Sequence, residues 1–466
     1  MLPEDILLNI FDFYRLDATQ LSRGRPWRWH RLAHVCRKWR YVISISPRRL
    51  DLRILCKYGA PIESILGFWP TIPLVIKFDA TRKSKPMPRN IPVALRCSDR
   101  ICDINLRMTS SMTGSIVELI QKPCPTLEKI RLTVKDAMGP SNIPIHDAFL
   151  GGSVPHLREI ELDGIPLPFP AIRRVLLSTN KLTELHLSNI PNVVYFSPVD
   201  LVTALSTLHQ LKQLAIGFHS PTSRPAPSMT RRPLRRTTLP SLKVLDFHGA
   251  SEYLEEFVAQ IELPALSKTT IRLFNDIFFE IQELGKFIPC LNALKSPSRV
   301  IVNHSVDFVS VHFEEGKPPN ETCYLGTSCK QLDWRLSFVT QILSQLSSLL
   351  SSVHVLVIQS GDEFPTGEED VDSTEWLELF QLFTHVTQVD VSEKLVPSIT
   401  PALVAEGMTA EVLPDLTSLQ LRGYRRFQSV AKAAEQFIAT RKLSGHTVSL
   451  TSGDEVRLCS SLILLR

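Results

Sequence analysis

The sequence predicts an α/β protein in which a short all-α segment is followed by a solenoid of strand–helix repeats. Three observations predict this fold. Two amphipathic helical patterns lie within about the first fifty residues, one apolar motif recurs between positions 101 and 421, and prolines stand ahead of several copies of that motif. Hydrophobic residues make up 44% of the 466 positions, which is enough for a chain of this length to bury a hydrophobic core.

The first helical pattern runs from Leu2 to Phe11. Pro3 suits the first turn of a helix, where its missing N–H leaves no hydrogen bond unmade. Glu4 and Asp5 place negative charge beside the positive end of the helix dipole. Apolar residues recur along one face at steps of about three and four: Leu2, Ile6, Leu7, Ile10 and Phe11.

A second helical pattern runs from Trp29 to Ile43, after a polar stretch, and Ser46-Pro47 is expected to end it. Its apolar positions are Leu32, Val35, Cys36, Trp39, Val42 and Ile43. Two such faces in so short a segment form a marginal core on their own. We expect the helices to be covered by another protein; the alternative is a small bundle packed on the rest of the chain.

These N-terminal residues resemble the F-box family. Leu2-Pro3-Glu4-Asp5-Ile6-Leu7 is similar to the opening of the family, and Val35-Cys36-Arg37-Lys38-Trp39 is similar to its Val-Cys-x-x-Trp helix. The resemblance covers residues 1–50 and implies docking on a Skp-family adaptor, which links to a cullin–RING ubiquitin ligase. By this match the adaptor-binding residues would be Leu2, Pro3, Ile6, Leu7, Ile10, Phe11, Val35, Cys36 and Trp39. For the last three, Val35, Cys36 and Trp39, the alternative is a place in the core of the F-box itself.

Apolar residues at i, i+3 and i+5 form the repeated motif. Its copies begin at Ile101, Leu127, Leu157, Leu182, Leu211, Leu242, Val353, Val386 and Leu416. Within the two runs, successive copies start 25 to 33 residues apart, around the upper end of the range for leucine-rich repeats. The array resembles the irregular leucine-rich repeats that often follow an F-box, although it lacks the asparagine that normally follows the strand.

The physical chemistry of the motif favours a solenoid. The last two apolar residues of each copy lie two apart on a short strand and point inward, and the first fills the core at the preceding turn. Helical patterns lie between copies, for example at 116–120 and 201–208. Prolines two residues before an anchor end the preceding helix: Pro125, Pro155, Pro240 and Pro414.

These patterns divide the chain into three parts. Residues 1–50 form the F-box, residues 51–100 a connecting or capping segment, and residues 101–466 a leucine-rich-repeat-like substrate-binding array. The array is irregular at about 266–350, where strand patterns lack a clear anchor. We expect degenerate repeats there; a separate small domain is the alternative.

The composition and motifs exclude several classes of function. A net charge of +5 is too small to favour a nucleic-acid partner. The apolar window 338–358 is interrupted by polar residues, so we expect no membrane span, and the N-terminus lacks the pattern of a signal peptide. The nine scattered cysteines are expected to be reduced thiols, which favours a cytoplasmic or nuclear location or both. No catalytic string or metal-binding spacing appears, so we expect no enzyme activity, metal or cofactor.

Together these features predict the substrate-recognition adaptor of a Skp–cullin–F-box type ubiquitin ligase, which recruits a protein target of unknown identity for degradation. A non-catalytic scaffold with a non-degradative F-box is the main alternative, and an enzyme in the irregular stretch is a second. Two charged segments, the basic 224–236 and the acidic 361–370, are interpreted as solvated loops, with a docking role as the alternative.

Overall fold

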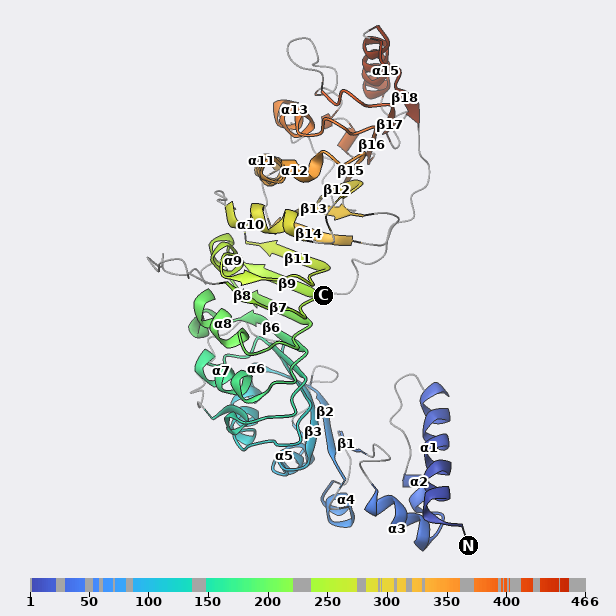
Figure 1. Ribbon diagram of the computed structural model, residues 1–466, viewed down its shortest axis with the longest axis vertical. Helices are drawn as coiled ribbons and strands as arrows, with labels where there is room; N and C mark the ends of the chain where they lie inside the picture. Colours follow the sequence, from blue (N-terminus) through green and yellow to red (C-terminus); the bar gives the residue numbers. More distant parts are fainter. Residues whose placement is uncertain are drawn as a thin grey trace. The chain divides into compact units, whose positions relative to one another are not determined.

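The fold is given by a computed structural model. It describes residues 2–21, 30–46, 53–57, 62–69, 72–80, 87–135, 148–220, 236–274, 282–291, 294, 296–305, 308–315, 321–328, 332–360, 373–392, 395–396, 398–399, 402, 412–421, 428–443 and 445–451. The chain divides into two compact units, one made of residues 1–196 and 207–211 and the other of residues 197–206 and 212–466. Strands and helices alternate along most of both units (Figure 1).

Three helices open the first unit: α1 (Glu4–Leu21), α2 (His30–Ala33) and α3 (Arg37–Ile45). The prediction of one helix over 29–43 is wrong, because Cys36 interrupts it. Cys36 has extended backbone angles, φ −158° and ψ 173°, and its Sγ accepts the backbone N–H of Trp39. A short side-chain acceptor at this position caps the first turn of a new helix. α3 ends at Ile45, just before Ser46-Pro47, as the sequence predicts.

Six strands of the first unit form a parallel sheet in chain order. They are β1 (Ile54–Cys56), β2 (Leu74–Asp79), β3 (Ile101–Met108), β4 (Lys129–Val134), β5 (Glu159–Asp163) and β6 (Glu184–Ile190). The sheet therefore begins at β1, inside the predicted connecting or capping segment 51–100. The connections contain α4 (Ile62–Phe68), α5 (Asn90–Leu95), α6 (Ser110–Leu119), η2 (Phe149–Gly152), α7 (Phe169–Ser178) and η3 (Asn192–Val194).

The second unit also contains a long sheet. Its strands are β7 (Gln213–Phe218), β9 (Val244–Gly249), β11 (Lys268–Leu273), β12 (Arg299–His304), β13 (Phe308–Glu314), β14 (Glu321–Ser328), β15 (Val355–Ser360), β16 (Gln388–Val391), β17 (Ser418–Leu421) and β18 (Ser449–Thr451). Their order across the sheet is β7-β9-β11-β14-β13-β12-β15-β16-β17-β18. Strands β8 (Thr237–Thr238) and β10 (Ile261–Glu262) form a separate parallel pair.

The helices of the second unit alternate with these strands, and most of them lie along one side of the sheet (Figure 1). They are α8 (Pro198–Leu205), α9 (Ser251–Val258), α10 (Gln282–Phe287), η4 (Ile288–Cys290), α11 (Leu332–Gln345), α12 (Ser347–Leu350), α13 (Ser373–Gln381) and α15 (Gln428–Leu443). None of the described helices combines the length and the apolar character that a membrane span requires.

All nine copies of the predicted motif lie at parallel strands of these sheets. The first residue of each copy is buried, with at most 2% of its surface exposed: Ile101, Leu127, Leu157, Leu182, Leu211, Leu242, Val353, Val386 and Leu416. In eight copies the strand starts two residues after this anchor, and β3 starts at the anchor Ile101 itself. The α/β fold, with a helical N-terminal region followed by leucine-rich-repeat-like strands, is thus confirmed.

The irregular stretch contains a three-stranded antiparallel meander. β12 pairs antiparallel with β13, and β13 pairs antiparallel with β14. The outer strands continue the sheet, because β14 runs parallel to β11 and β12 runs parallel to β15. An odd number of alternating strands leaves both edges of the meander parallel to their neighbours. The expectation of degenerate repeats between 266 and 350 is therefore wrong for residues 299–328.

Candidate functional site

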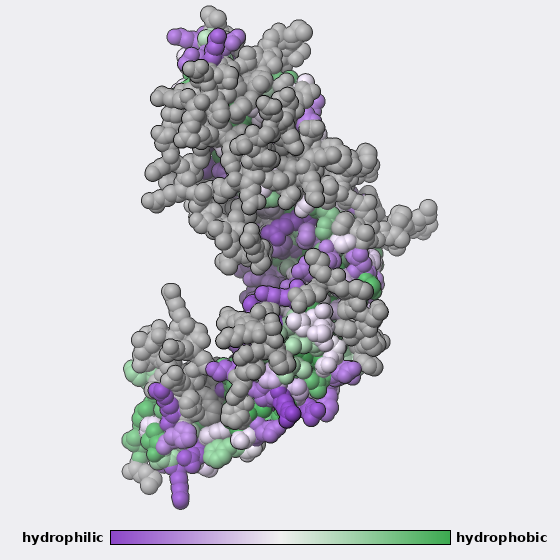
Figure 2. All heavy atoms as spheres, turned by 180° about the vertical axis from the view of Figure 1, so that it is seen from behind, coloured by the Kyte–Doolittle hydropathy of each residue, from purple (hydrophilic) through white to green (hydrophobic). Residues whose placement is uncertain are grey.

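Helix α1 has two apolar faces. Leu7, Leu8 and Phe11 are buried, and they lie on one side of the helix. A second stripe stays exposed at i, i+4 and i+7 of the helix, with Ile6 40%, Ile10 39% and Phe13 76% exposed, and Leu2, 50% exposed, stands two residues before the helix begins. Residues at this spacing share one face of a helix. We call these four residues the α1 stripe. Hydrophobic surface is visible over the N-terminal helices at the lower left of Figure 2.

The buried side of α1 forms the core of the helical region together with α3. The rings of Phe11 and Trp39 meet edge to face with their centroids 4.9 Å apart, a favourable aromatic geometry. Val42 and Ile43 of α3 are also buried. This internal core holds the helix with the α1 stripe turned outward.

Two hydrogen bonds from basic side chains add to this packing. Lys38 Nζ donates to the backbone oxygen of Leu2 at 2.6 Å and so joins the start of α1 to α3. Arg40 Nε donates to the backbone oxygen of Ala33 at 3.1 Å across the break between α2 and α3. Ala33 ends α2, where the backbone carbonyls have no intrahelical partner, and Leu2 precedes the first residue of α1.

The structure divides the nine residues that the F-box resemblance assigned to adaptor binding. Leu7 and Phe11 are buried in the internal core, which assigns them a packing role and removes them from the exposed surface. Trp39 is half-buried against Phe11. The other six are exposed: Leu2, Pro3, Ile6, Ile10, Val35 and Cys36.

Three exposed apolar residues of this region were missed at the sequence level. Phe13 completes the α1 stripe, and its i+3 spacing from Ile10 was the available signal. Tyr41 and Ile45 lie four apart on α3 and are 57% and 52% exposed. The periodicity marked both faces of each helix as apolar, and only the packing tells which face remains uncovered.

In the first unit, the outward side chains of the strands form one face of the sheet, which we call the strand face. Charges on this face pair across neighbouring strands. Lys129 Nζ lies 2.9 Å from Glu159 Oε2, and Arg131 bonds to the same carboxylate. Burial alone would raise the pKa of Glu159, but the bonds from Arg131 and Lys129 outweigh it, and the pKa is lowered. For Asp103, burial dominates and raises the pKa.

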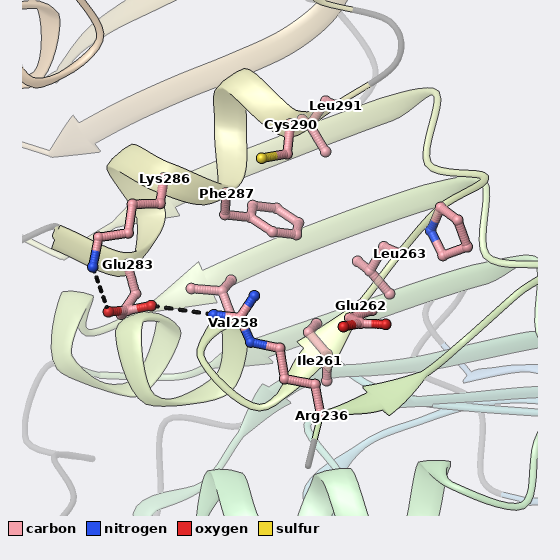
Figure 3. A pocket seen from close by; sticks show the side chains of 11 residues that line it. Arg236, Val258, Ile261, Glu262, Leu263, Glu283, Lys286, Phe287, Cys290 and Leu291 are labelled. Atoms are coloured by element: carbon pink, nitrogen blue, oxygen red, sulfur yellow. Dashed lines mark hydrogen bonds and ion pairs between the residues drawn. The ribbon is translucent and has the colours of Figure 1, made fainter. Parts of the chain in front are cut away.

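A pocket of about 330 Å³ lies on the helix side of the second unit, between α9, β10 and α10 (Figure 3). Its walls are mostly apolar, with Phe287 and Leu263 among them. At its rim Glu283 pairs with Lys286 at 2.9 Å and with Arg236 at 3.4 Å. These charged groups face one another, and no histidine stands beside Cys290 among the lining residues. The pocket lacks the paired nucleophile and base of a hydrolytic centre.

Metal-binding groups of three or more His, Cys, Asp or Glu side chains do not occur within the described ranges. The acidic segment 361–370 lies outside the described residues, and so does the basic segment 224–236 except for Arg236. The sequence-level interpretation of both as solvated loops therefore stays a prediction.

Comparison with known proteins identifies the helical region. Residues 1–53 match the domain family described as F-box-like. No curated protein matches the chain. Among solved structures, the leucine-rich repeat-containing protein LegL7 from Legionella pneumophila is similar at 14% identity and a TM-score of 0.31, over 74% of this chain and 99% of that one. The N-terminal domain is F-box-like, and such a domain is typical of protein-interaction adaptors.

Proposed function

We propose that this chain is the substrate-recognition adaptor of a Skp–cullin–F-box type ubiquitin ligase. Its F-box-like domain would bind a Skp-family adaptor, and its repeat region would bind the protein to be ubiquitinated. The chain itself would catalyse no covalent chemistry. Its effect would be to hold the target near the ubiquitin-loaded enzyme, which raises the effective concentration of the target lysine.

The α1 stripe carries this proposal. Three large apolar side chains at helical spacing on α1, together with Leu2 just before the helix, remain in water although the other face of the same helix is packed. Covering one such side chain contributes roughly 1.5–3 kcal/mol before the costs of association. An amphipathic helix with anchors at this spacing is the form that binds in an apolar groove of a partner.

The internal core uses only one of the two apolar faces of α1 and leaves the α1 stripe uncovered. Leu7, Leu8 and Phe11 supply the apolar face that a small helical unit needs for folding. A second apolar face serves no purpose in such a unit unless another protein covers it. The exposed Val35, at the turn between α2 and α3, adds an apolar residue to the surface of the same domain.

The test is co-purification from cells with the Skp-family adaptor and a cullin. The full chain should retain both. Replacing Leu2, Pro3 and Ile6 together by Ser, Ala and Ser should release both while the circular dichroism of the repeats is unchanged, because these residues are exposed. The matched control replaces Val193, an 82% exposed residue of the repeat region, by Ser.

Each outcome of this experiment has one meaning. Retention of the adaptor by the triple variant contradicts the assignment of the α1 stripe. Binding of the adaptor without a cullin indicates a scaffold outside the ligase. Binding of neither by the unaltered chain contradicts the proposed function.

A further inference from the structure

Arg272, on the strand face of the second unit, differs from the other arginines of the described strands. Arg107 pairs with Asp79, Arg131 with Glu159 and Glu161, and Arg299 with Glu314. Arg272 forms no ion pair or hydrogen bond within the described part of the chain, and the group it contacts is the aromatic ring of Tyr324. A half-buried guanidinium with its N–H donors unused is an uncommon arrangement, because arginine normally meets an acceptor.

The position of Arg272 is set by aromatic neighbours. Its Cζ lies 5.7 Å from the centroid of the Tyr324 ring, within the range of a cation–π contact. The rings of His312 and Tyr324 are nearly perpendicular, with centroids 4.6 Å apart, so Tyr324 contacts both Arg272 and His312. On the other side, β9 places His248 directly opposite Arg272, and Phe274 lies 4.8 Å from the His248 ring.

A glycine makes room for this arrangement. Gly326 of β14 stands opposite Arg272 of β11 in the parallel register. A Cβ at Gly326 would come within 2.9 Å of the Tyr324 hydroxyl, so this hydroxyl lies over the glycine and beside the arginine. Strands β9, β11 and β14 are adjacent in the sheet (Figure 1).

Three polar groups on these adjacent strands therefore have hydrogen-bonding capacity left over. The guanidinium of Arg272, the hydroxyl of Tyr324 and the imidazole of His248 make no hydrogen bond with one another or with the rest of the described residues. Asp246 of β9 lies two residues before His248 and stands opposite Thr270 in the register. Burial and the charge of Arg272 lower the pKa of His248, so the imidazole favours its neutral form.

We propose that Arg272, with Tyr324 and His248 beside it, binds an oxyanion carried by the protein that this chain recruits. The inference rests on the proposed function, because it assigns the chemistry of the recruited segment. A planar guanidinium binds two oxygens of a carboxylate or phosphate at once. Partial burial strengthens that interaction, because the dielectric constant is lower than in water. The recruited segment therefore carries an acidic or phosphorylated side chain.

The experiment measures binding of the purified full chain to arrays of degenerate peptides. Each array fixes one central residue, which is phosphoserine, glutamate, serine or lysine. The unaltered chain should retain the phosphoserine array, the glutamate array or both at least about tenfold over the lysine array, since a hydrogen-bonded charge pair contributes about 1.5–3 kcal/mol. Preference for phosphoserine over glutamate identifies a phosphorylated partner, and equal retention identifies an acidic one.

Four variants assign this preference to the site. Arg272→Gln should abolish it, and Arg272→Lys should restore only part, because an ammonium lacks the two-pronged geometry. Tyr324→Phe keeps the ring that holds the arginine and removes only the hydroxyl, so a smaller loss is expected. Lys268→Gln is the control, since Lys268 is an exposed cation on the same face of β11, and the preference should be unchanged.

Two results would overturn the proposal. One is equal retention of the glutamate, phosphoserine and lysine arrays by the unaltered chain. The other is an undiminished preference in Arg272→Gln. Co-purification of the Skp-family adaptor is measured on the same Arg272→Gln protein and should be unaffected, so failure of this inference is distinguishable from failure of the proposed function.

Discussion

His312 shows how burial alone sets the charge of a single side chain. It is 5% exposed on β13, where its Nε2 lies 3.2 Å from Ser310 Oγ and its ring meets Tyr324. Burial lowers the pKa of His312 from 6.5 to about 4, because a charged imidazole is poorly solvated there. The folded protein therefore keeps this residue neutral at a pH at which the unfolded chain already protonates it.

The resulting pH dependence has a definite sign. Between about pH 6.5 and pH 4 the unfolded state binds a proton at His312 that the folded state does not. Stability is therefore full above about pH 6.5 and falls as the pH is lowered through this window. Urea unfolding of the unaltered chain should lose up to about 3 kcal/mol more than His312→Gln across it. Parallel pH profiles of the two proteins would contradict the assignment.

Two adjacent glycines provide a test of local sterics. Gly151 and Gly152 both have positive φ, +59° and +68°. A Cβ at Gly151 would lie 2.5 Å from the Pro123 ring, whereas at Gly152 the nearest atom is Arg174 Cβ at 3.7 Å. Gly152→Ala should cost about 1–2 kcal/mol for the left-handed backbone. Gly151→Ala should cost about 1–3 kcal/mol more for the clash. Thermal unfolding of the two variants measures the difference, and equal melting temperatures would refute it.

The spacing of apolar residues in the sequence marked some of the exposed residues of the candidate site and missed others. The spacing of Leu2, Ile6 and Ile10 marked an apolar face, and these side chains are exposed. Leu7 and Phe11 fitted the same pattern, yet they form the internal core. A helical period gives the angular position of each residue, but which side a neighbouring helix covers depends on the tertiary arrangement. Arg272 gave no signal, since its neighbours come from β9 and β14.

At the scale of one element, a repeat strand is stable because its inward side chains pack under neighbouring strands. Leu245 of β9 is fully buried, between Leu214 of β7 and Thr269 of β11 in the register. Leu245→Ala should lower the free energy of unfolding by about 2–5 kcal/mol. Leu177 on α7 is 51% exposed, so Leu177→Ala should change it by no more than about 0.5 kcal/mol. Similar denaturation midpoints for both variants would contradict the placement of Leu245.

The sequence predicted the element order well where the motif is regular. Each of the nine copies marks a strand because its buried anchor and two inward side chains leave a repeated apolar pattern. The meander at 299–328 was missed for a physical reason. Alternation of apolar and polar residues is the same in parallel and antiparallel strands, so it cannot reveal that β13 runs backwards. β1 and β18, with three residues each, are too short to show a period.

At the scale of the whole molecule, the two proposed activities belong to different units. The α1 stripe lies in the first unit, and Arg272 lies in the second. The first unit also carries the strand face on which charges pair across β4 and β5. An adaptor needs this separation of roles, since one partner must stay bound while the other is exchanged.

The proposed function depends most on the α1 stripe being an interface. The direct test is calorimetric titration of a purified Skp-family adaptor into the full chain and into a variant with Ile6, Ile10 and Phe13 each changed to Ser. Loss of buried interface anchors typically costs more than about 1 kcal/mol each, so the variant should bind at least about a hundredfold more weakly, with its unfolding curve retained. Equal affinity for the two proteins would contradict the central claim.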